Sequence, residues 1–108
     1  MKKILLALAL AVPCLTLCAG ETIRVQTGIE VLRAEGFKVL KGKRVGLTTN
    51  PTGVDSNLKS TIDILHEAKE VNLVALYGPE HGVRGNVHAG DKVADEVDPK
   101  TGLKMYSL

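Results

Sequence analysis

The sequence predicts an α/β domain built on a parallel sheet, and three observations lead to this prediction. Residues 44–49 (RVGLTT) and 71–77 (VNLVALY) have the β-branched and apolar character of strands. Between them, apolar residues recur at spacings of four and three, which is the pattern of a helix. A strand, a helix and a strand within about 35 residues form a βαβ unit, whose two strands lie parallel.

Residues 1–20 have the layout of a secretory signal peptide. Lys2 and Lys3 precede an apolar stretch that runs from Ile4 to Leu17, and Cys18-Ala19-Gly20 supplies small residues for cleavage. The stretch is short for a membrane-spanning helix, which needs about 20 residues. We therefore expect export to the periplasm or the extracellular space, no stable membrane span, and a mature domain over residues 21–108. The alternative is an N-terminal anchor that stays attached.

Both cysteines of the chain, Cys14 and Cys18, lie in this segment. The mature domain is therefore expected to contain no disulfide, although an exported protein could form one. Cys18 is also a candidate for lipid anchoring, but Leu17 stands directly before it, where a lipoprotein signal usually has a small residue.

Composition argues against nucleic acid as a partner. The chain has 14 basic and 12 acidic residues, and loss of Lys2 and Lys3 leaves the two counts equal. A neutral domain has no electrostatic attraction for a polyanion. Phe37, Tyr77 and Tyr106 are the aromatic residues, too few to form a stacking platform for bases.

The elements before the first strand begin with a short helix. Thr27 is its predicted N-cap and Gly36 its C-terminal glycine. A turn at residues 41–43 (KGK) leads into the strand at 44–49. Residues 50–53 (NPTG) are strong turn formers and should end that strand.

The central helix is predicted from one apolar stripe. Asn57 or Ser60 can cap it, and Asp63 lies in its first turn, where the helix dipole favours a negative charge. The stripe consists of Leu58, Ile62, Leu65 and Ala68.

The next strand, 71–77, is nearly continuous in apolar residues, which favours a strand covered on both faces. A turn at 98–102 (DPKTG) precedes a last strand near 104–108 (KMYSL). Because the sequence stops there without a further helix, we expect a truncated domain whose other strands are missing.

The octapeptide at residues 78–85 (GPEHGVRG) carries the strongest functional signal. It places a carboxylate, an imidazole and a guanidinium on a glycine-rich loop after a buried strand. Glu80 is a candidate general acid, or a structural carboxylate that caps loop amides. His81 is a candidate for orienting substrate or for bracing the loop. Arg84 is a candidate for binding a carboxylate or phosphate bidentately, or for bracing the loop.

Ligands of open α/β sheets bind at the carboxyl ends of the strands. Asn50 and Glu80 both follow such ends, so the loop at 50–53 and the octapeptide should line one cleft.

No cofactor or metal is predicted. Glu70 stands where a metalloprotease helix would have its second histidine after His66, so that pattern fails. His81 and His88 with Glu80 are the remaining zinc alternative, without the tight spacing of known sites. Residues 85–92 (GNVHAGDK) look superficially like a phosphate loop, but an aspartate replaces the required lysine. The sequence also lacks the nucleophile-elbow motif of serine hydrolases, which argues against a nucleophilic serine.

Four segments together resemble the exo-β-N-acetylmuramidases of the NamZ type. They are residues 45–54 (VGLTTNPTGV), 60–66 (STIDILH), 73–85 (LVALYGPEHGVRG) and 97–103 (VDPKTGL). The resemblance covers about residues 25–108, and the order and spacing of the segments are more specific than any single motif.

The resemblance implies a Rossmann-like domain of a glycoside hydrolase that releases N-acetylmuramic acid from peptidoglycan fragments. It implies that Glu80 is the catalytic residue, in a cleft between this domain and a smaller C-terminal domain. Such a hydrolase usually needs a second carboxylate. As a hypothesis, Asn50 and His81 hold the sugar, and charge complementarity suggests that Arg84 pairs with the lactyl group of muramic acid.

The chain departs from the family in two ways. Family members are several times longer, so we expect that their C-terminal domain and half of the cleft lie outside this sequence. Asp91, Asp95 and Glu96 are weak local substitutes for the second carboxylate. Pro51 stands where many relatives are expected to have histidine. A non-catalytic module that binds cell-wall sugars is therefore the alternative function.

Overall fold

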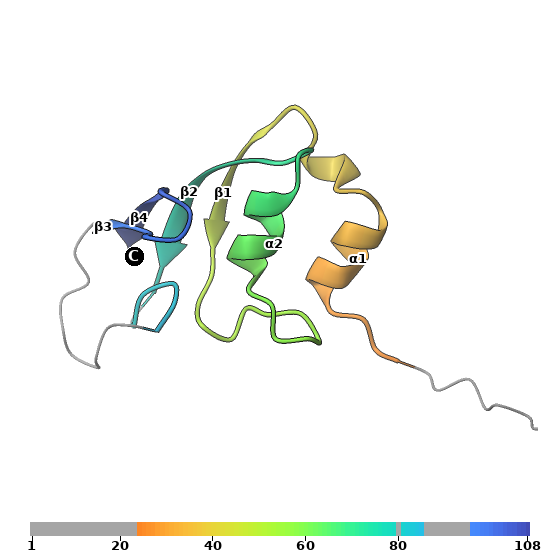
Figure 1. Ribbon diagram of the computed structural model, residues 1–108, viewed down its shortest axis with the longest axis horizontal. Coiled ribbons are helices and arrows are strands. Elements are labelled where there is room, and N and C mark those ends of the chain that lie inside the picture. Colours follow the sequence, from red (N-terminus) through yellow and green to blue (C-terminus); the bar gives the residue numbers. More distant parts are fainter. Residues whose placement is uncertain (1–23, 80, 86–95) are drawn as a thin grey trace, which may run out of the picture.

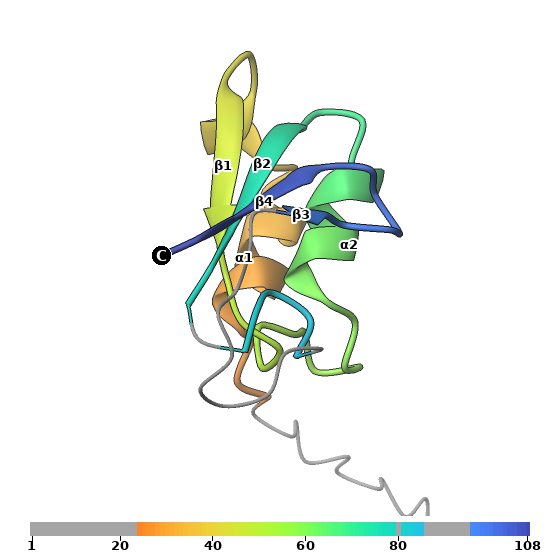
Figure 2. The same ribbon diagram turned by 90° about the vertical axis from the view of Figure 1, so that its left-hand side faces the viewer.

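The computed structural model describes residues 24–79, 81–85 and 96–108, which form a four-stranded sheet with helices packed on one face (Figure 1, Figure 2). The predicted signal peptide, with Cys14 and Cys18, lies outside these residues. Within them, none of the helices combines the length and the apolar character needed to cross a membrane. In chain order the elements are α1 (Gly28–Ala34), η1 (Lys38–Leu40), β1 (Arg44–Thr48), α2 (Thr61–Glu67), β2 (Asn72–Gly78), β3 (Glu96–Val97) and β4 (Lys104–Ser107).

The sheet has the order β1-β2-β4-β3. Strands β1, β2 and β4 are parallel, and β3 runs antiparallel to β4. The prediction of an α/β fold with a βαβ unit is therefore confirmed: α2 connects β1 to its parallel neighbour β2. Strand β3 was not predicted, because its two residues end a polar segment and pair only through contact with β4.

The core lies between the sheet and the helices. Leu76, on the central strand β2, and Ile62, on α2, are fully buried. On β1, Val45 and Leu47 pack against this core. On the opposite face of the sheet, the rings of Tyr77 and Tyr106 stack with their centroids 5.3 Å apart. The described helices cover the face of the sheet that carries Leu76, Val45 and Leu47, and none of them covers the face with the tyrosine pair (Figure 2).

Helix α1 forms as its capping residues predict. Thr27 is the N-cap, and its backbone N–H donates to the Glu30 carboxylate at 2.7 Å. After the helix, Gly36 adopts a left-handed φ of 65° that ends the turn. Ile29 and Leu32 of this helix pack against the core.

Helix α2 starts later than its apolar stripe predicts. Ser60 is the N-cap, and its hydroxyl accepts from the Ile62 N–H at 3.2 Å. Leu58 was assigned to the stripe, and this was wrong: it has a left-handed φ of 62° and is 81% exposed. The reason is local, because the buried Asp55 carboxylate accepts from the backbone N–H of Asn57 and Lys59, which closes a loop before the helix.

Candidate functional site

The two predicted loops meet at one end of the sheet. The loop at 50–53 follows β1 and the octapeptide follows β2, and both lie below the arrowheads of these parallel strands in Figure 1. Their contact is between Gly85 and Pro51: a β-carbon built on Gly85 would lie 2.9 Å from Pro51 Cγ. The parallel strands therefore bring the two loops into contact, while the cleft that they are expected to line stays a prediction.

Asn50 shapes its own turn. Its Oδ1 accepts from the Thr52 backbone N–H at 3.2 Å and from the Thr52 hydroxyl at 2.9 Å, while its backbone carbonyl accepts from Gly53 N–H at 3.0 Å. The residue is exposed. Both hydrogen bonds to Oδ1 come from Thr52, so this side-chain oxygen is used within the turn.

In the octapeptide, Glu80 lies outside the described residues, so its role as catalytic residue stays a prediction. His81 is exposed and has a left-handed φ of 73°, a conformation that histidine adopts more readily than most residues. Val83 anchors the loop: it is 3% exposed, and its Cγ1 would lie 3.1 Å from a β-carbon on Gly78. Sequence reasoning missed this anchor, whose one signal is a lone apolar residue among polar and glycine residues.

Arg84 is bound by two carboxylates of the chain. Its Nε donates to Asp98 Oδ1 at 2.6 Å and its Nη2 to Asp98 Oδ2 at 2.8 Å, which is a bidentate pair. Nη2 also donates to Asp63 Oδ1 at 3.0 Å. The bidentate contact of Arg84 is with Asp98 of the chain itself, which agrees with the loop-bracing alternative; binding of a ligand carboxylate by Arg84 stays a prediction. Among the described residues, none accepts a hydrogen bond from Nη1.

The two carboxylates belong to two different parts of the fold. Asp63 lies in the first turn of α2, as predicted, and it also accepts from Lys100 Nζ. Asp98 lies in the turn between β3 and β4, where the Thr101 hydroxyl donates to it at 2.6 Å. Neither contact of Arg84 could be read from the sequence, because the three residues are far apart along the chain.

Hydrogen bonds and charges stabilise the ionised forms of this cluster. The hydrogen bond from Arg84 is the main reason that the pKa of Asp98 falls to about 2. Burial raises the pKa of Asp63, but the hydrogen bonds from Lys100 and Arg84 outweigh it, so the pKa ends below its ordinary value. The pKa of Arg84 is raised, chiefly by its hydrogen bond to Asp98. The cluster contains two carboxylates and two cations and is formally neutral.

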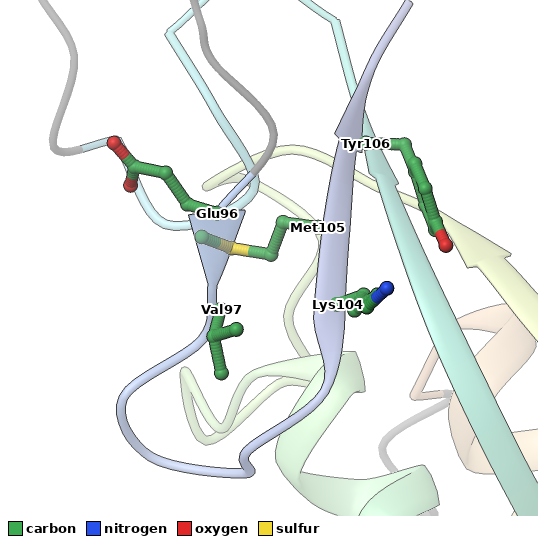
Figure 3. Close-up of a pocket in the computed structure, with 5 residues that line it drawn as sticks. All are labelled: Glu96, Val97, Lys104, Met105 and Tyr106. Carbon is green, nitrogen blue, oxygen red and sulfur yellow. The ribbon is translucent and has the colours of Figure 1, made fainter.

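A pocket of about 210 Å³ lies beside the edge of the sheet, along β3 and β4 (Figure 3). Glu96, Val97, Lys104, Met105 and Tyr106 line it. It includes none of Asn50, His81 or Arg84, so its position does not mark the predicted sugar site.

The metal alternative is not tested, because two of its three residues, Glu80 and His88, lie outside the described residues. Among residues 24–79, 81–85 and 96–108, no group of three or more His, Cys, Asp or Glu side chains is placed to hold a metal ion. His88, Asp91 and Asp95 lie outside these residues. Glu96, the third local substitute for a second carboxylate, is exposed at the start of β3.

Comparison with known proteins shows that both loops lie in a segment shared with a known family. Residues 45–108 match the sequence model of the family described as exo-β-N-acetylmuramidase NamZ, N-terminal. The peptidoglycan β-N-acetylmuramidase NamZ of Bacillus subtilis (strain 168) is 56% identical over 85 residues, which are 79% of this chain and 20% of that protein. The crystal structure of a DUF1343 family protein from Bacteroides fragilis NCTC 9343 is 68% identical, with a TM-score of 0.69, over 79% of this chain and 20% of that chain. The chain thus spans about a fifth of the length of these relatives.

Proposed function

We propose that this chain, which belongs to the NamZ family of exo-β-N-acetylmuramidases, contributes part of the active site of a peptidoglycan glycosidase. The contact between Pro51 and Gly85 carries this proposal, because it joins the two polar loops at the edge of the sheet where α/β folds bind ligands. Both loops lie within the residues that match the family.

The proposed substrate is a peptidoglycan fragment with N-acetylmuramic acid at its non-reducing end. The relative from Bacillus subtilis bears the name of a peptidoglycan β-N-acetylmuramidase. Because that substrate belongs to the cell wall, the proposal agrees with the export predicted from residues 1–20.

In the proposed reaction, Glu80 donates its proton to the glycosidic oxygen as the bond from that oxygen to the anomeric carbon breaks. Water then adds to the anomeric carbon, and Glu80 takes up a proton as base. The products are free N-acetylmuramic acid and a shortened fragment. A second carboxylate, from elsewhere in the full-length protein, would stabilise or attack the anomeric carbon.

Asn50 and His81 are proposed to hold the sugar, Asn50 through Nδ2. Arg84 is proposed to contact the lactyl carboxylate, which distinguishes muramic acid from glucosamine. Since Nε and Nη2 donate to Asp98 and Asp63, this contact would use Nη1 and a single nitrogen rather than a fork.

The test is an assay of the purified full-length protein with muropeptides and with an aryl β-glycoside of N-acetylmuramic acid. We expect release of N-acetylmuramic acid, detected by mass spectrometry, that is insensitive to a metal chelator. Saturable binding of the same fragments without release would contradict the proposal and favour a sugar-binding module. Loss of activity with a chelator would favour the metal alternative through His81 and His88.

A further inference from the structure

The Arg84 cluster is a network of opposite charges at the end of the octapeptide, formed by Arg84, Asp63, Asp98 and Lys100. The Asp98 side chain is fully buried and that of Asp63 is 9% exposed, whereas that of Lys100 is 61% exposed. The network therefore has a buried carboxylate, Asp98, at its centre, paired with the 25% exposed side chain of Arg84, and an exposed outer cation, Lys100.

A buried ion pair adds little net stability, because the cost of removing two charges from water offsets their attraction. Removing one partner is nevertheless costly, since the other charge is left buried and unpaired. The main effect of such a pair is thus on geometry: the bidentate contact with Asp98 fixes both the position and the plane of the guanidinium.

Three consecutive residues attach the octapeptide to three different parts of the fold. Val83 is buried in the core, Arg84 binds Asp63 on α2 and Asp98 beside β4, and Gly85 packs on Pro51 in the neighbouring loop. Of these contacts, only those of Arg84 are directional and charged.

We propose that Asp98, assisted by Asp63, is a positioning residue of the proposed glycosidase site. Its bidentate contact holds the guanidinium of Arg84, and with it the backbone of residues 82–85, in the position that the reaction requires. This inference rests on the proposed function for its effect on turnover, but not for its effect on the loop. Because misplacement of a catalytic loop by about 1 Å can cost about 100-fold in rate, release of Arg84 should lower kcat.

The test compares Asp98→Asn with Asp55→Asn in the full-length protein. Asp55 is a matched control: it is 3% exposed, accepts from Arg33 Nη2 at 2.8 Å and accepts from two backbone N–H groups. Both substitutions remove a buried charge from an arginine. Of these two aspartates, only Asp98 binds the arginine of the octapeptide.

Two readouts are needed. The first is hydrogen exchange of the backbone amides at residues 82–85, which should become about tenfold faster in Asp98→Asn and stay unchanged in Asp55→Asn. The second is turnover of the muramic acid glycoside, where kcat should fall about 10- to 100-fold in Asp98→Asn alone, with a smaller change in KM.

Equal exchange rates and equal kcat in the two variants would overturn the proposal. If the wild-type protein lacks turnover, the proposed function fails, and the exchange rates still decide whether Asp98 holds the loop. If Asp98→Asn does not fold, Asp63→Asn takes its place, because it removes the charge of the second carboxylate that binds Arg84 Nη2. A loop as protected in that variant as in Asp55→Asn would also overturn the proposal.

Discussion

Gly85 and Pro51 are in such close contact that a β-carbon on Gly85 would lie 2.9 Å from Pro51 Cγ. This contact joins loops that follow two neighbouring parallel strands, β1 and β2. Pro51 is also the residue at which we expect many relatives to have histidine. In this chain the ring of Pro51 fills the space at the junction. The ring has no hydrogen-bond donor, so its contact with Gly85 is one of packing alone.

Gly85→Ala is expected to disrupt this junction, and Gly42→Ala is its control. Both glycines have a left-handed φ, 77° and 71°, but a β-carbon on Gly42 would meet nothing within 4 Å. Alanine should cost about 1–2 kcal/mol at either position for the backbone. At Gly85, overpacking against Pro51 should add about 1–3 kcal/mol. Urea unfolding measures both, and equal destabilisation would contradict the contact.

Gly46→Ala tests the packing on the sheet face that carries the tyrosine pair. A β-carbon on Gly46 would lie 2.9 Å from Tyr77 Cε2, and Tyr77 stacks on Tyr106. We expect a loss of about 1–3 kcal/mol, because the ring must move or the strands must separate.

The control for that substitution is Gly28→Ala, at the start of α1, where the new methyl group would meet nothing within 4 Å. It should be neutral or stabilise the protein by up to about 1 kcal/mol, since alanine is the better helix former. Thermal unfolding of both variants checks the pair. A Gly46→Ala protein as stable as Gly28→Ala would show that Tyr77 does not pack there.

Local signals predicted much of this fold. A few neighbouring residues encode each of three features: the cap at Thr27, the turn at 50–53 and the alternation between strand and helix. The βαβ unit, and the position of its loops at one end of the sheet, could therefore be predicted from the sequence. Leu58 was misplaced because its spacing fits a helix, whereas Asp55 closes a loop around it.

The contacts of Arg84 illustrate what the sequence could not show. A lone arginine in a glycine-rich loop has the same appearance whether it binds a substrate or an aspartate 14 positions away. Only the fold brings Asp63 and Asp98 to it. The same holds for β3, whose pairing depends on β4.

Stability should fall in acid, and Asp98 should account for part of this fall. Its pKa is about 2 in the folded protein, against an ordinary value of 3.8. A carboxyl group with a lowered pKa contributes stability that is complete above about pH 4 and is lost as the pH falls towards 2. Asp55, Asp63 and Glu30 also have lowered pKa values and add to the effect.

Urea unfolding between pH 2 and pH 7 measures this dependence. In Asp98→Asn, which cannot titrate, stability should change less steeply below pH 4, by up to about 1.4 kcal/mol per pH unit for the one missing proton. A variant with the wild-type slope would contradict the assignment of the low pKa to Asp98.

Substrate preference tests the proposed contact of Arg84 with the lactyl carboxylate. In Arg84→Ala, the ratio of kcat/KM for muramic acid over N-acetylglucosamine aryl glycosides should fall about 10-fold or more, because a hydrogen bond to a charged group is lost. Asp98→Asn is the control, since it loosens the loop but keeps Nη1. An unchanged preference in Arg84→Ala would leave the arginine with its positioning role alone.

Turnover of a muramic acid β-glycoside by full-length Glu80→Gln tests the central claim most directly. The substitution keeps the size of the side chain and removes its acidic, titratable proton, so binding of N-acetylmuramic acid and the unfolding temperature should both stay near wild-type values. We predict that kcat falls about 100- to 10,000-fold, the usual contribution of a general acid. A kcat within a few-fold of the wild-type value would contradict the account.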